Sequence, residues 1–509
     1  MNRRSLFLVL ASLAVPALLS ARVVLPTHFT SNMVLQQQSA LRIKGQARPH
    51  STVDLQTSWS RTPASATADG EGRFEMEIAT PKASLKPQTL TFNDGEETTL
   101  ENVLIGEVWL GSGQSNMEMP VEGWGKVLNY EEEVANANYP MIRLLQVKKT
   151  TSISPREQVE VNMDGWQECS PQYIRNFSAL CYFYALRLWE ELKVPVGVID
   201  DDWGGTVAEA WVSAESLEQV SGFESLIGKY RELGFDREAI EKYYAQLAAD
   251  SEENRQHQNK DKMPQARFPL DNPNHPTVLF NSMIHPLVSF PLRGIIWYQG
   301  CSNVGRGKQY EPLFQTLIHD WRRQFGNPQM PFYFVQLANY QEPSDLQPDS
   351  QWALLREAQA KALCLPNTEM AVNIDLGDAR DIHPKTKREL GRRLAAIALH
   401  HTYGRTKTVC TAPVYRDFKV KDDKIHVYFS LPEGSEPLVE EDALPGFIVQ
   451  GSDLKWHVAE ARTVNGSEVV VSSPEVRFPI AVRYGWADNP TCTLRTQGNF
   501  HVAPFRTDY

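Results

Sequence analysis

A serine in a glycine-rich turn is the residue of this chain best suited to do chemistry. The apolar, β-favouring segment Val103–Leu110 predicts a buried strand. Gly111 and Gly113 then break that strand and permit a sharp turn. Ser115 follows at the expected start of a helix, where backbone N–H groups are free to stabilise an oxyanion. These features favour a nucleophilic serine, and the alternative is a polar loop in which Ser115 only caps the helix.

A histidine far along the chain is a candidate for the base that such a serine needs. His383 lies on a loop that follows the apolar segment Met370–Ile374. An imidazole there can take the serine proton and later give it to the leaving alcohol. A carboxylate normally orients such an imidazole, and Asp381 is the nearest acid. Asp378 and a backbone carbonyl are the alternatives.

Neutral amides follow another predicted strand, Gly294–Tyr298. Gln299 and Asn303 lie just beyond it, and an amide at a strand end can donate to a developing oxyanion without adding charge. Gln299 is the first choice and Asn303 the second. In a purely structural interpretation, Gln299 only ties down a loop.

The elements that must position these residues form an alternating series. From residue 101 to about 407, apolar strands alternate with amphipathic helices, which predicts a parallel sheet with helices on both faces. The expected strands are Val103–Leu110, Ile142–Val147, Val196–Ile199, Gly294–Tyr298, Phe332–Leu337 and Met370–Ile374. Ligands bind beyond the carboxyl ends of such strands. Ser115, Gly204 and Gln299 each follow a strand, so all three should meet at one rim.

The remaining segments divide the chain into further expected units. Residues 22–100 read as a small N-terminal β-sandwich, and residues 408–509 as a C-terminal β-domain. Within the 101–407 unit, the polar and charged stretch at about 213–275 predicts a helical insertion. It is either a lid beside the site or solvated scaffolding.

The first residues predict export from the cytoplasm. Met1–Ala21 combines a basic start, an apolar run and a small-residue end, as in a signal peptide. An uncleaved anchor is the alternative, and either way a periplasmic or secreted location follows. No later apolar run is long enough to form a membrane helix.

Composition excludes several classes of partner and chemistry. A net charge of −11 argues against nucleic acid binding. The six cysteines match no zinc motif in their spacing, and no disulfide is predicted. Phosphate-loop, dinucleotide and zinc signatures do not occur, so no metal or other cofactor is expected for the reaction.

Five blocks of sequence occur in an order that resembles a known family. They are Glu107–Met119, Asp202–Thr206, Ile296–Asn303, Trp352–Gln359 and Asp375–Lys385. The series is similar to that of the SGNH hydrolases and, more narrowly, the sialate O-acetylesterase family of carbohydrate esterases. The likeness runs from about residue 25 to the C-terminus. It implies an SGNH-type three-layer α/β/α parallel sheet between two β-domains.

The resemblance also implies roles for individual residues. Ser115 becomes the nucleophile and His383 the general base, while Gly205, or Gly204, supplies an oxyanion donor. The candidates for substrate contact are Gln114, Trp203, Arg356 and Gln359. Arg356 and Gln359 share one helix face, and bracing the site is the alternative role for them.

The chain departs from the family pattern at three places. Cys301 stands where the family generally has Glu, and Arg380 where SGNH enzymes often have the Asp of Asp-x-x-His. The acidic run Asp200–Asp202 replaces residues that are usually small. The change at Cys301 removes a possible carboxylate partner for the site, and a base positioned for Ser115 need not reach the Cys301 thiol. The change at Arg380 leaves Asp381 as the expected third member of the triad.

Together these observations predict a secreted serine esterase that removes O-acetyl groups from sugars. Sialic acid esters are the family's namesake substrate, and acetylated xylan or another plant glycan is the alternative. A second hypothesis is a non-catalytic glycan-binding protein on a hydrolase scaffold, which the changes at Cys301 and Arg380 motivate.

Overall fold

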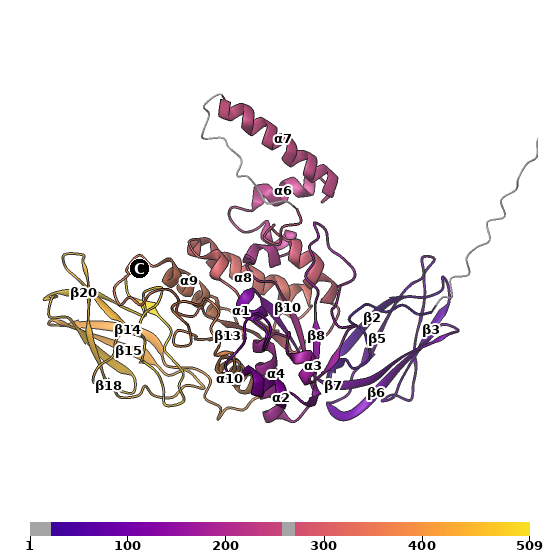
Figure 1. The fold of residues 1–509 in the computed structure, drawn as a ribbon, viewed down its shortest axis with the longest axis horizontal. Coiled ribbons are helices and arrows are strands. Elements are labelled where there is room, and N and C mark those ends of the chain that lie inside the picture. Colours follow the sequence, from indigo (N-terminus) through magenta and orange to yellow (C-terminus); the bar gives the residue numbers. More distant parts are fainter. Residues whose placement is uncertain (1–21, 257–269, 509) are drawn as a thin grey trace, which may run out of the picture.

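A parallel sheet forms the centre of the molecule in the computed structural model, which describes residues 22–256 and 270–508 (Figure 1). The expected signal segment Met1–Ala21 lies outside the described residues. The sheet has the order β13-β12-β11-β7-β10-β8-β9, and all neighbours are parallel except β8 and β9. Its strands are β7 (Glu97–Gly113), β8 (Tyr139–Gln146), β9 (Gln167–Cys169), β10 (Val196–Asp202), β11 (Gly294–Tyr298), β12 (Phe332–Val335) and β13 (Thr368–Ala371). The expected strands of the central sheet are thus confirmed, with β13 starting two residues and ending three residues earlier than expected.

The register of the middle strands brings their carboxyl ends to one edge. Gly113 at the end of β7 lies opposite Asp202 on β10 and opposite Tyr298 on β11. Parallel strands present their carboxyl ends on the same side of a sheet. The segments that follow these three strands therefore start from a common rim, as the sequence predicts.

Helices cover both faces of the central sheet (Figure 1). On one side lie α4 (Ala179–Leu192) and α10 (Lys387–Ile397), which pack against each other and against the sheet. On the other lie α8 (Gly307–Gln324) and α9 (Gln351–Ala360). The shorter helices are α1 (Ser115–Glu118), α2 (Tyr130–Asn136) and α3 (Pro171–Ile174).

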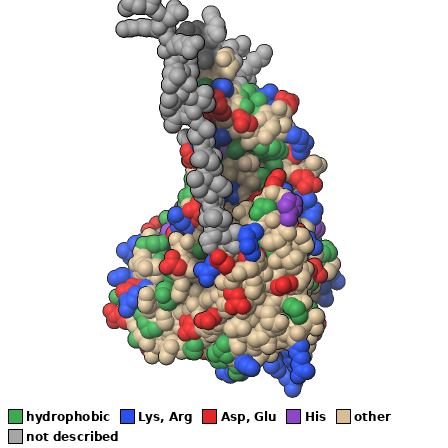
Figure 2. Space-filling model, turned by 90° about the vertical axis from the view of Figure 1, so that its right-hand side faces the viewer, with side chains coloured by type: hydrophobic (Ala, Val, Ile, Leu, Met, Phe, Trp, Pro, Cys, Tyr) green, Lys and Arg blue, Asp and Glu red, His purple; other side chains and the backbone are tan. Residues whose placement is uncertain are grey.

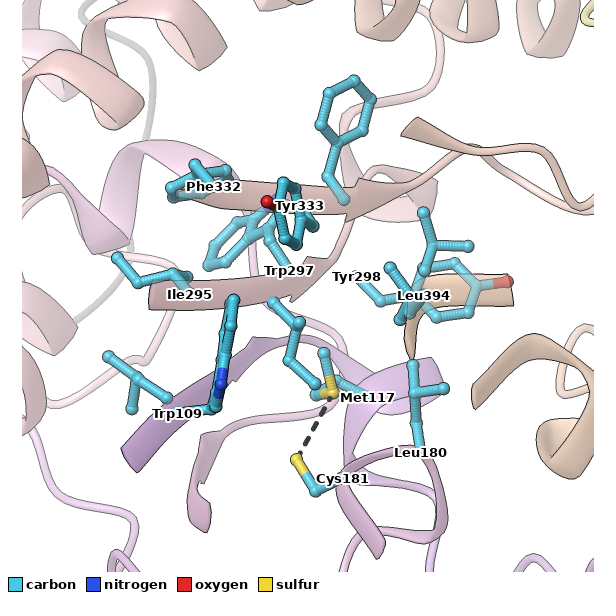
Figure 3. Packing of buried hydrophobic residues seen from close by; sticks show 14 of the residues in the cluster. Trp109, Met117, Leu180, Cys181, Ile295, Trp297, Tyr298, Phe332, Tyr333 and Leu394 are labelled. Atoms are coloured by element: carbon cyan, nitrogen blue, oxygen red, sulfur yellow. Dashed lines mark hydrogen bonds between the residues drawn. The ribbon is translucent and has the colours of Figure 1, made fainter. Parts of the chain in front are cut away.

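Large aromatic side chains fill the core between these layers (Figure 3). Trp109 on β7 stacks on Tyr333 of β12, with ring centroids 5.7 Å apart. Met117 of α1 contacts Cys181 of α4 through the two sulfur atoms, 3.8 Å apart. Fully burying one such side chain contributes roughly 1.5–3 kcal/mol. This packing therefore stabilises the strands that carry the active-site segments.

The N-terminal region shares a strand with the central sheet. Its strands are β1 (Val34–Gln36), β2 (Ala40–Gln46), β3 (Thr52–Thr57), β4 (Ala64–Thr67), β5 (Arg73–Ala79) and β6 (Ser84–Asn93). β6 pairs with the first half of β7, and β2 pairs with β5 in a separate sheet. The sequence boundary expected at residues 100 and 101 falls inside β7. Basic and acidic side chains are intermixed over this end of the molecule (Figure 2). In the N-terminal region, for example, Arg42 of β2 forms an ion pair with Glu75 of β5.

Two four-stranded antiparallel sheets form the C-terminal region. One has the order β14-β15-β19-β18 and the other β17-β16-β20-β21. The strands are β14 (Val414–Lys421), β15 (Lys424–Ser430), β16 (Phe447–Gly451), β17 (Trp456–Val458), β18 (Glu460–Asn465), β19 (Glu468–Ser472), β20 (Pro479–Tyr484) and β21 (Phe505–Arg506). Tyr415 stacks on Phe505 between the sheets, with centroids 4.6 Å apart.

The expected insertion contains three helices in its described part. They are α5 (Ala214–Leu217), α6 (Glu224–Glu232) and α7 (Arg237–Gln256). α6 and α7 project from the central region at the top of Figure 1. Among the described residues, no helix has the length and apolar character needed to cross a membrane.

Candidate active site

Ser115 is the first residue of helix α1, two residues beyond the end of β7. The turn depends on Gly113, which has a φ of +141°. A Cβ at this position would lie 2.2 Å from the backbone oxygen of Tyr298 on the neighbouring strand. Only glycine fits, so the close approach of β7 and β11 fixes where the chain turns. The half-buried Ser115 then lies at the rim of the sheet.

The glycine pair after β10 lies against the serine. A Cβ on Gly204 would be 3.2 Å from the Cβ of Ser115. The N–H of Gly204 donates to the carboxylate of Glu118 at 2.5 Å, so this donor is already used. Gly205 is exposed, with a φ of +77°, and its N–H has no partner in the described part of the chain. Of the two glycines, Gly205 is therefore the one free to receive an oxyanion.

His383 is the half-buried base candidate, and its imidazole contacts two side chains. Its Nδ1 lies 3.5 Å from Oδ1 of Asp381, and its ring meets the edge of Trp124 at a centroid distance of 5.0 Å. Burial and the nearby Lys387 ammonium lower the pKa of His383, while Asp381 opposes this shift. The ring is thus mostly neutral at neutral pH, which is the form that a general base requires.

The two candidate carboxylates differ in their contacts. Oδ1 of Asp381 also accepts the backbone N–H of His383 at 2.9 Å, which holds the carboxylate beside the ring. Asp378 instead accepts the N–H of Arg380 at 2.8 Å and is exposed. The structure thus brings Asp381, but not Asp378, into contact with His383.

Hydrogen bonds join the serine helix to the histidine loop. The Asn116 side chain, next to Ser115, donates to the backbone oxygen of Ile382, next to His383, at 2.8 Å. The Lys387 ammonium donates to the Asn116 side-chain oxygen at 2.7 Å and to the Pro384 carbonyl at 2.9 Å. In the described chain no hydrogen bond joins the Ser115 hydroxyl directly to the imidazole. The two segments are therefore held side by side by their neighbours.

Lys387 is a site residue that sequence reasoning did not identify as important. It is buried, and its ammonium lies 5.6 Å from the ring centroid of Tyr298. Burial lowers the pKa of Lys387 to about 7, and burial raises that of the nearby Cys301 thiol to about 12. A raised pKa disfavours the thiolate, which is the nucleophilic form of a cysteine. In the sequence, the only indication of a role for Lys387 was its position four residues after His383.

The two amides expected in the oxyanion hole have other partners. Gln299 is fully buried and its amide nitrogen donates to the Thr206 carbonyl at 3.1 Å and to Asn303 Oδ1 at 2.7 Å. The Asn303 amide nitrogen in turn donates to Glu209 at 2.9 Å. Both side chains therefore brace the loop after β10, and this arrangement does not support either as an oxyanion donor. The alternative interpretation, that Gln299 ties down a loop, fits the contacts.

Three of the expected substrate-binding residues are also buried, and each forms hydrogen bonds to backbone groups of neighbouring segments. Gln114 accepts the backbone N–H of Gly300 at 3.0 Å, and Gln359 donates to the Gln299 carbonyl at 3.0 Å. Arg356 donates to four backbone oxygens of Leu337, Ala338, Ala487 and Asp488 at 2.7–2.9 Å. Each is at most 3% exposed, so none can contact a sugar without first losing these bonds. Trp203, by contrast, is only partly buried at the rim.

The unusual acids at the end of β10 are all buried. Asp200 accepts hydrogen bonds from the Gln146 side chain at 2.9 Å and from the Ser178 N–H at 3.2 Å. Burial and the Asp200 charge raise the pKa of Asp202 well above its usual range. Burial and a neighbouring like charge both disfavour the ionised form of this carboxyl group.

A cleft of about 360 Å³ opens beside these groups. Trp124, which contacts His383, and Glu118, on the helix of Ser115, both line it. The other polar lining residues are Gln146, Lys148, Lys149, Asn162, Asn176 and Asp202. A volume of this size and a mixture of amides, charges and one aromatic ring suit a small polar ligand.

Comparison with known proteins points to one family. Residues 272–400 match the model of a carbohydrate esterase, sialic acid-specific acetylesterase domain. The chain is 29% identical to the sialate O-acetylesterase of Homo sapiens over 417 residues, which cover 77% of this chain and 72% of the relative. The corresponding protein of Mus musculus is 28% identical over 435 residues, or 79% and 76% of the two chains.

A solved structure resembles nearly the whole molecule. The carbohydrate acetylesterase from Xanthomonas citri is 32% identical, with a TM-score of 0.79, over 96% of this chain and all of the other. The likeness extends over the N-terminal, central and C-terminal regions. The chain therefore belongs to the sialate O-acetylesterase family of carbohydrate esterases, and it is an ester-hydrolysing enzyme.

Proposed function

We propose that this enzyme removes O-acetyl groups from sugars through an acetyl-serine intermediate, with Ser115 as nucleophile and His383 as general base. The observation that carries the proposal is the Asn116–Ile382 hydrogen bond, which joins the neighbours of these two residues. The order of the parallel strands and the helices on both faces support an SGNH-type three-layer arrangement.

The reaction follows from the groups at the rim. His383 takes the proton of the Ser115 hydroxyl as its oxygen attacks the acetyl carbonyl carbon. The oxyanion receives hydrogen bonds from the N–H groups of Ser115 and Gly205. When the tetrahedral intermediate collapses, the sugar oxygen leaves with the proton from His383. Water, activated by the same imidazole, then releases acetate and restores the serine.

Asp381 is the carboxylate proposed to orient the base. It favours the tautomer with a proton on Nδ1, which leaves Nε2 free to accept the serine proton. The 3.5 Å separation of Nδ1 and Oδ1 is long for a hydrogen bond, and catalytic hydrogen bonds often shorten only when substrate binds. Closure of the site on substrate would bring the hydroxyl and the imidazole into direct contact.

The cleft beside Trp124 is the proposed sugar site. An aromatic ring offers a flat apolar face to a pyranose, while amides such as Asn162 and Asn176 bind hydroxyls. The names of the relatives favour sialic acid as the sugar. The carboxylate of that sugar would need a cation, and Lys148 and Lys149 line the cleft.

A neutral acetylated glycan such as acetylxylan is the second candidate, and one observation favours it. Lys149 is paired with Glu118 at 2.6 Å and Lys148 with Glu160 at 3.0 Å. Each ammonium is therefore already partly neutralised by a carboxylate, which weakens its attraction for a substrate carboxylate. A panel of O-acetylated sialic acids and acetylated xylo-oligosaccharides, compared by kcat/KM, distinguishes the two substrates.

The proposed location is outside the cytoplasm, and it rests on the pattern of Met1–Ala21 alone. Fractionation of cells that express the full chain, compared with a chain that starts at Arg22, tests it. Activity of the full chain in the cytoplasmic fraction would contradict the proposal.

The nucleophile is tested by Ser115→Ala with Ser112→Ala as the matched control. Ser112 is fully buried on β7, the strand that leads to Ser115, and its hydroxyl has no hydrogen-bond partner among the described residues, so its loss should change little. We expect Ser115→Ala to abolish hydrolysis of an aryl acetate and to prevent labelling by a serine-directed phosphonate. Full activity in the Ser115→Ala protein would reject the mechanism.

A further inference from the structure

A second group of reactive side chains lies between the central sheet and the C-terminal region, away from the ester site. His400 and His401 lie on the π-helix η7 (Ala398–Thr402), which continues from α10. Cys410 lies in the segment that leads to β14. One ring nitrogen from each histidine and the cysteine sulfur all lie within 4.8 Å of one another. The π-helical turn, a geometry often found at functional sites, places the ring centroids of these two consecutive histidines 4.7 Å apart.

Three donor atoms lie close enough together to share one metal ion, and a carboxylate lies near one of them. His401 Nε2 lies 3.6 Å from Cys410 Sγ and 3.8 Å from Oε1 of Glu369 on β13. Zinc binds nitrogen, sulfur and oxygen at about 2.0–2.3 Å, so ligand atoms at tetrahedral angles lie roughly 3.4–3.6 Å apart. The carboxylate of Glu369 lies outside the group of three whose donor atoms are all within 4.8 Å of one another, so it would have to move closer to complete a tetrahedral site.

His400 is already held in the orientation that a metal ligand needs. Its Nδ1 lies 2.9 Å from the Thr408 carbonyl oxygen, so Nδ1 carries the proton and donates it. The lone pair of Nε2 is then free. Histidine ligands usually donate their second nitrogen to a backbone carbonyl in this way. The Nε2 atom is also 3.8 Å from Oε1 of Glu433, which is largely exposed.

The anionic donors have no competing cation. Among the described residues, neither Glu369 nor Glu433 forms an ion pair with Lys or Arg. Gly434 packs over the group, because a Cβ there would lie 2.6 Å from the Cys410 sulfur and 3.0 Å from the His400 ring. A side chain at position 434 would fill the space beside the donors.

We propose that His400, His401, Cys410 and Glu369 bind one Zn²⁺ ion. Two imidazoles, one thiolate and one carboxylate form a borderline-soft donor set that suits zinc better than magnesium or calcium. The ion would join η7 and the edge strand β13 to the segment entering the C-terminal region. Its role is therefore structural and separate from the ester chemistry. No standard zinc spacing marks these residues in the sequence, because adjacent histidines and a distant glutamate converge only in the fold.

The experiment adds Zn²⁺ or Co²⁺ to the metal-free purified protein. We expect one equivalent of Zn²⁺ to bind and to raise the melting temperature, and Co²⁺ to give a thiolate-to-metal absorption band. Cys410→Ser should remove the band and weaken zinc binding more than about 100-fold, because even residues that only orient ligands cost 10–100-fold. Cys364→Ser, at an exposed cysteine, is the matched control and should keep both.

Glu369→Gln provides a second variant that retains the thiol. It should weaken zinc binding while the cobalt–thiolate band remains, so the carboxylate and thiolate contributions are separated. Binding of less than one equivalent, equal affinity in wild type and Cys410→Ser, or a cobalt complex without the thiolate band would each overturn the proposal. Aryl acetate hydrolysis by the metal-free protein is measured in parallel, and its loss would contradict the separation of the two sites.

Discussion

The rim of the active site and the layer beneath it both contain polar residues, but they differ in how many of their hydrogen bonds are made within the protein. At the rim, Ser115 and His383 are half-buried, and the Gly205 N–H has no internal partner in the described chain. Beneath it, Gln299 and Arg356 are fully buried and donate to several fixed acceptors. A polar group can serve a substrate only if the fold leaves its hydrogen bonds unmade. The comparison therefore separates reacting residues from supporting ones more clearly than the motifs do.

After loss of the Ser115 hydroxyl, the largest effect should come from loss of the general base at the rim. His383→Gln removes the group that accepts the serine proton, and we expect kcat for an aryl acetate to fall by about 10²–10⁴-fold. The melting temperature should stay within a few degrees of wild type, because the imidazole makes few internal contacts. His319→Gln, at an exposed histidine on α8, is the control and should keep full activity. An equal loss in both variants would contradict the role of His383.

The supporting layer should respond in stability. Arg356→Met removes the donor to four backbone oxygens, of which those of Ala338 and Asp488 keep another donor. Each of the two acceptors left unpaired costs about 1–3 kcal/mol. We expect the free energy of unfolding to fall by roughly 2–4 kcal/mol, measured by urea denaturation. Arg61→Met, at an exposed position, should change it by less than about 0.5 kcal/mol. A stable Arg356→Met protein with a selectively raised KM would instead favour substrate contact.

The sequence could predict the sheet and the rim because both depend on local patterns. Apolar runs followed by glycine or polar residues mark the strand ends, and the register of Gly113 with Asp202 and Tyr298 agrees with that prediction. The sequence could not show which amides are already hydrogen-bonded, because one partner of Gln299, the Thr206 carbonyl, lies 93 residues away in the chain. Lys387 was missed for the same reason, since its contact with Asn116 spans 271 residues.

The orienting carboxylate should have a smaller effect than the base. Asp381 is 43% exposed, and an ion pair so accessible to water contributes about 1 kcal/mol or less. Asp381→Asn is therefore expected to lower kcat by about 10-fold or less. Asp378→Asn, on the same loop but with its carboxylate turned to the Arg380 N–H, is the matched control. If Asp378→Asn lowers kcat more than Asp381→Asn does, Asp378 and not Asp381 would be the orienting carboxylate.

The smallest effect is a shift of the acidic limb of the pH profile. Neutral His383 is the active form, and its lowered pKa should place the rise of kcat/KM below pH 6.5. Because Asp381 raises this pKa, Asp381→Asn should move the limb to lower pH. Because the Lys387 ammonium lowers it, Lys387→Met should move the limb to higher pH, whatever the loss in maximal rate. Opposite shifts require both charges to act on one imidazole at the rim, whereas shifts in the same direction would show that the limb reports another group.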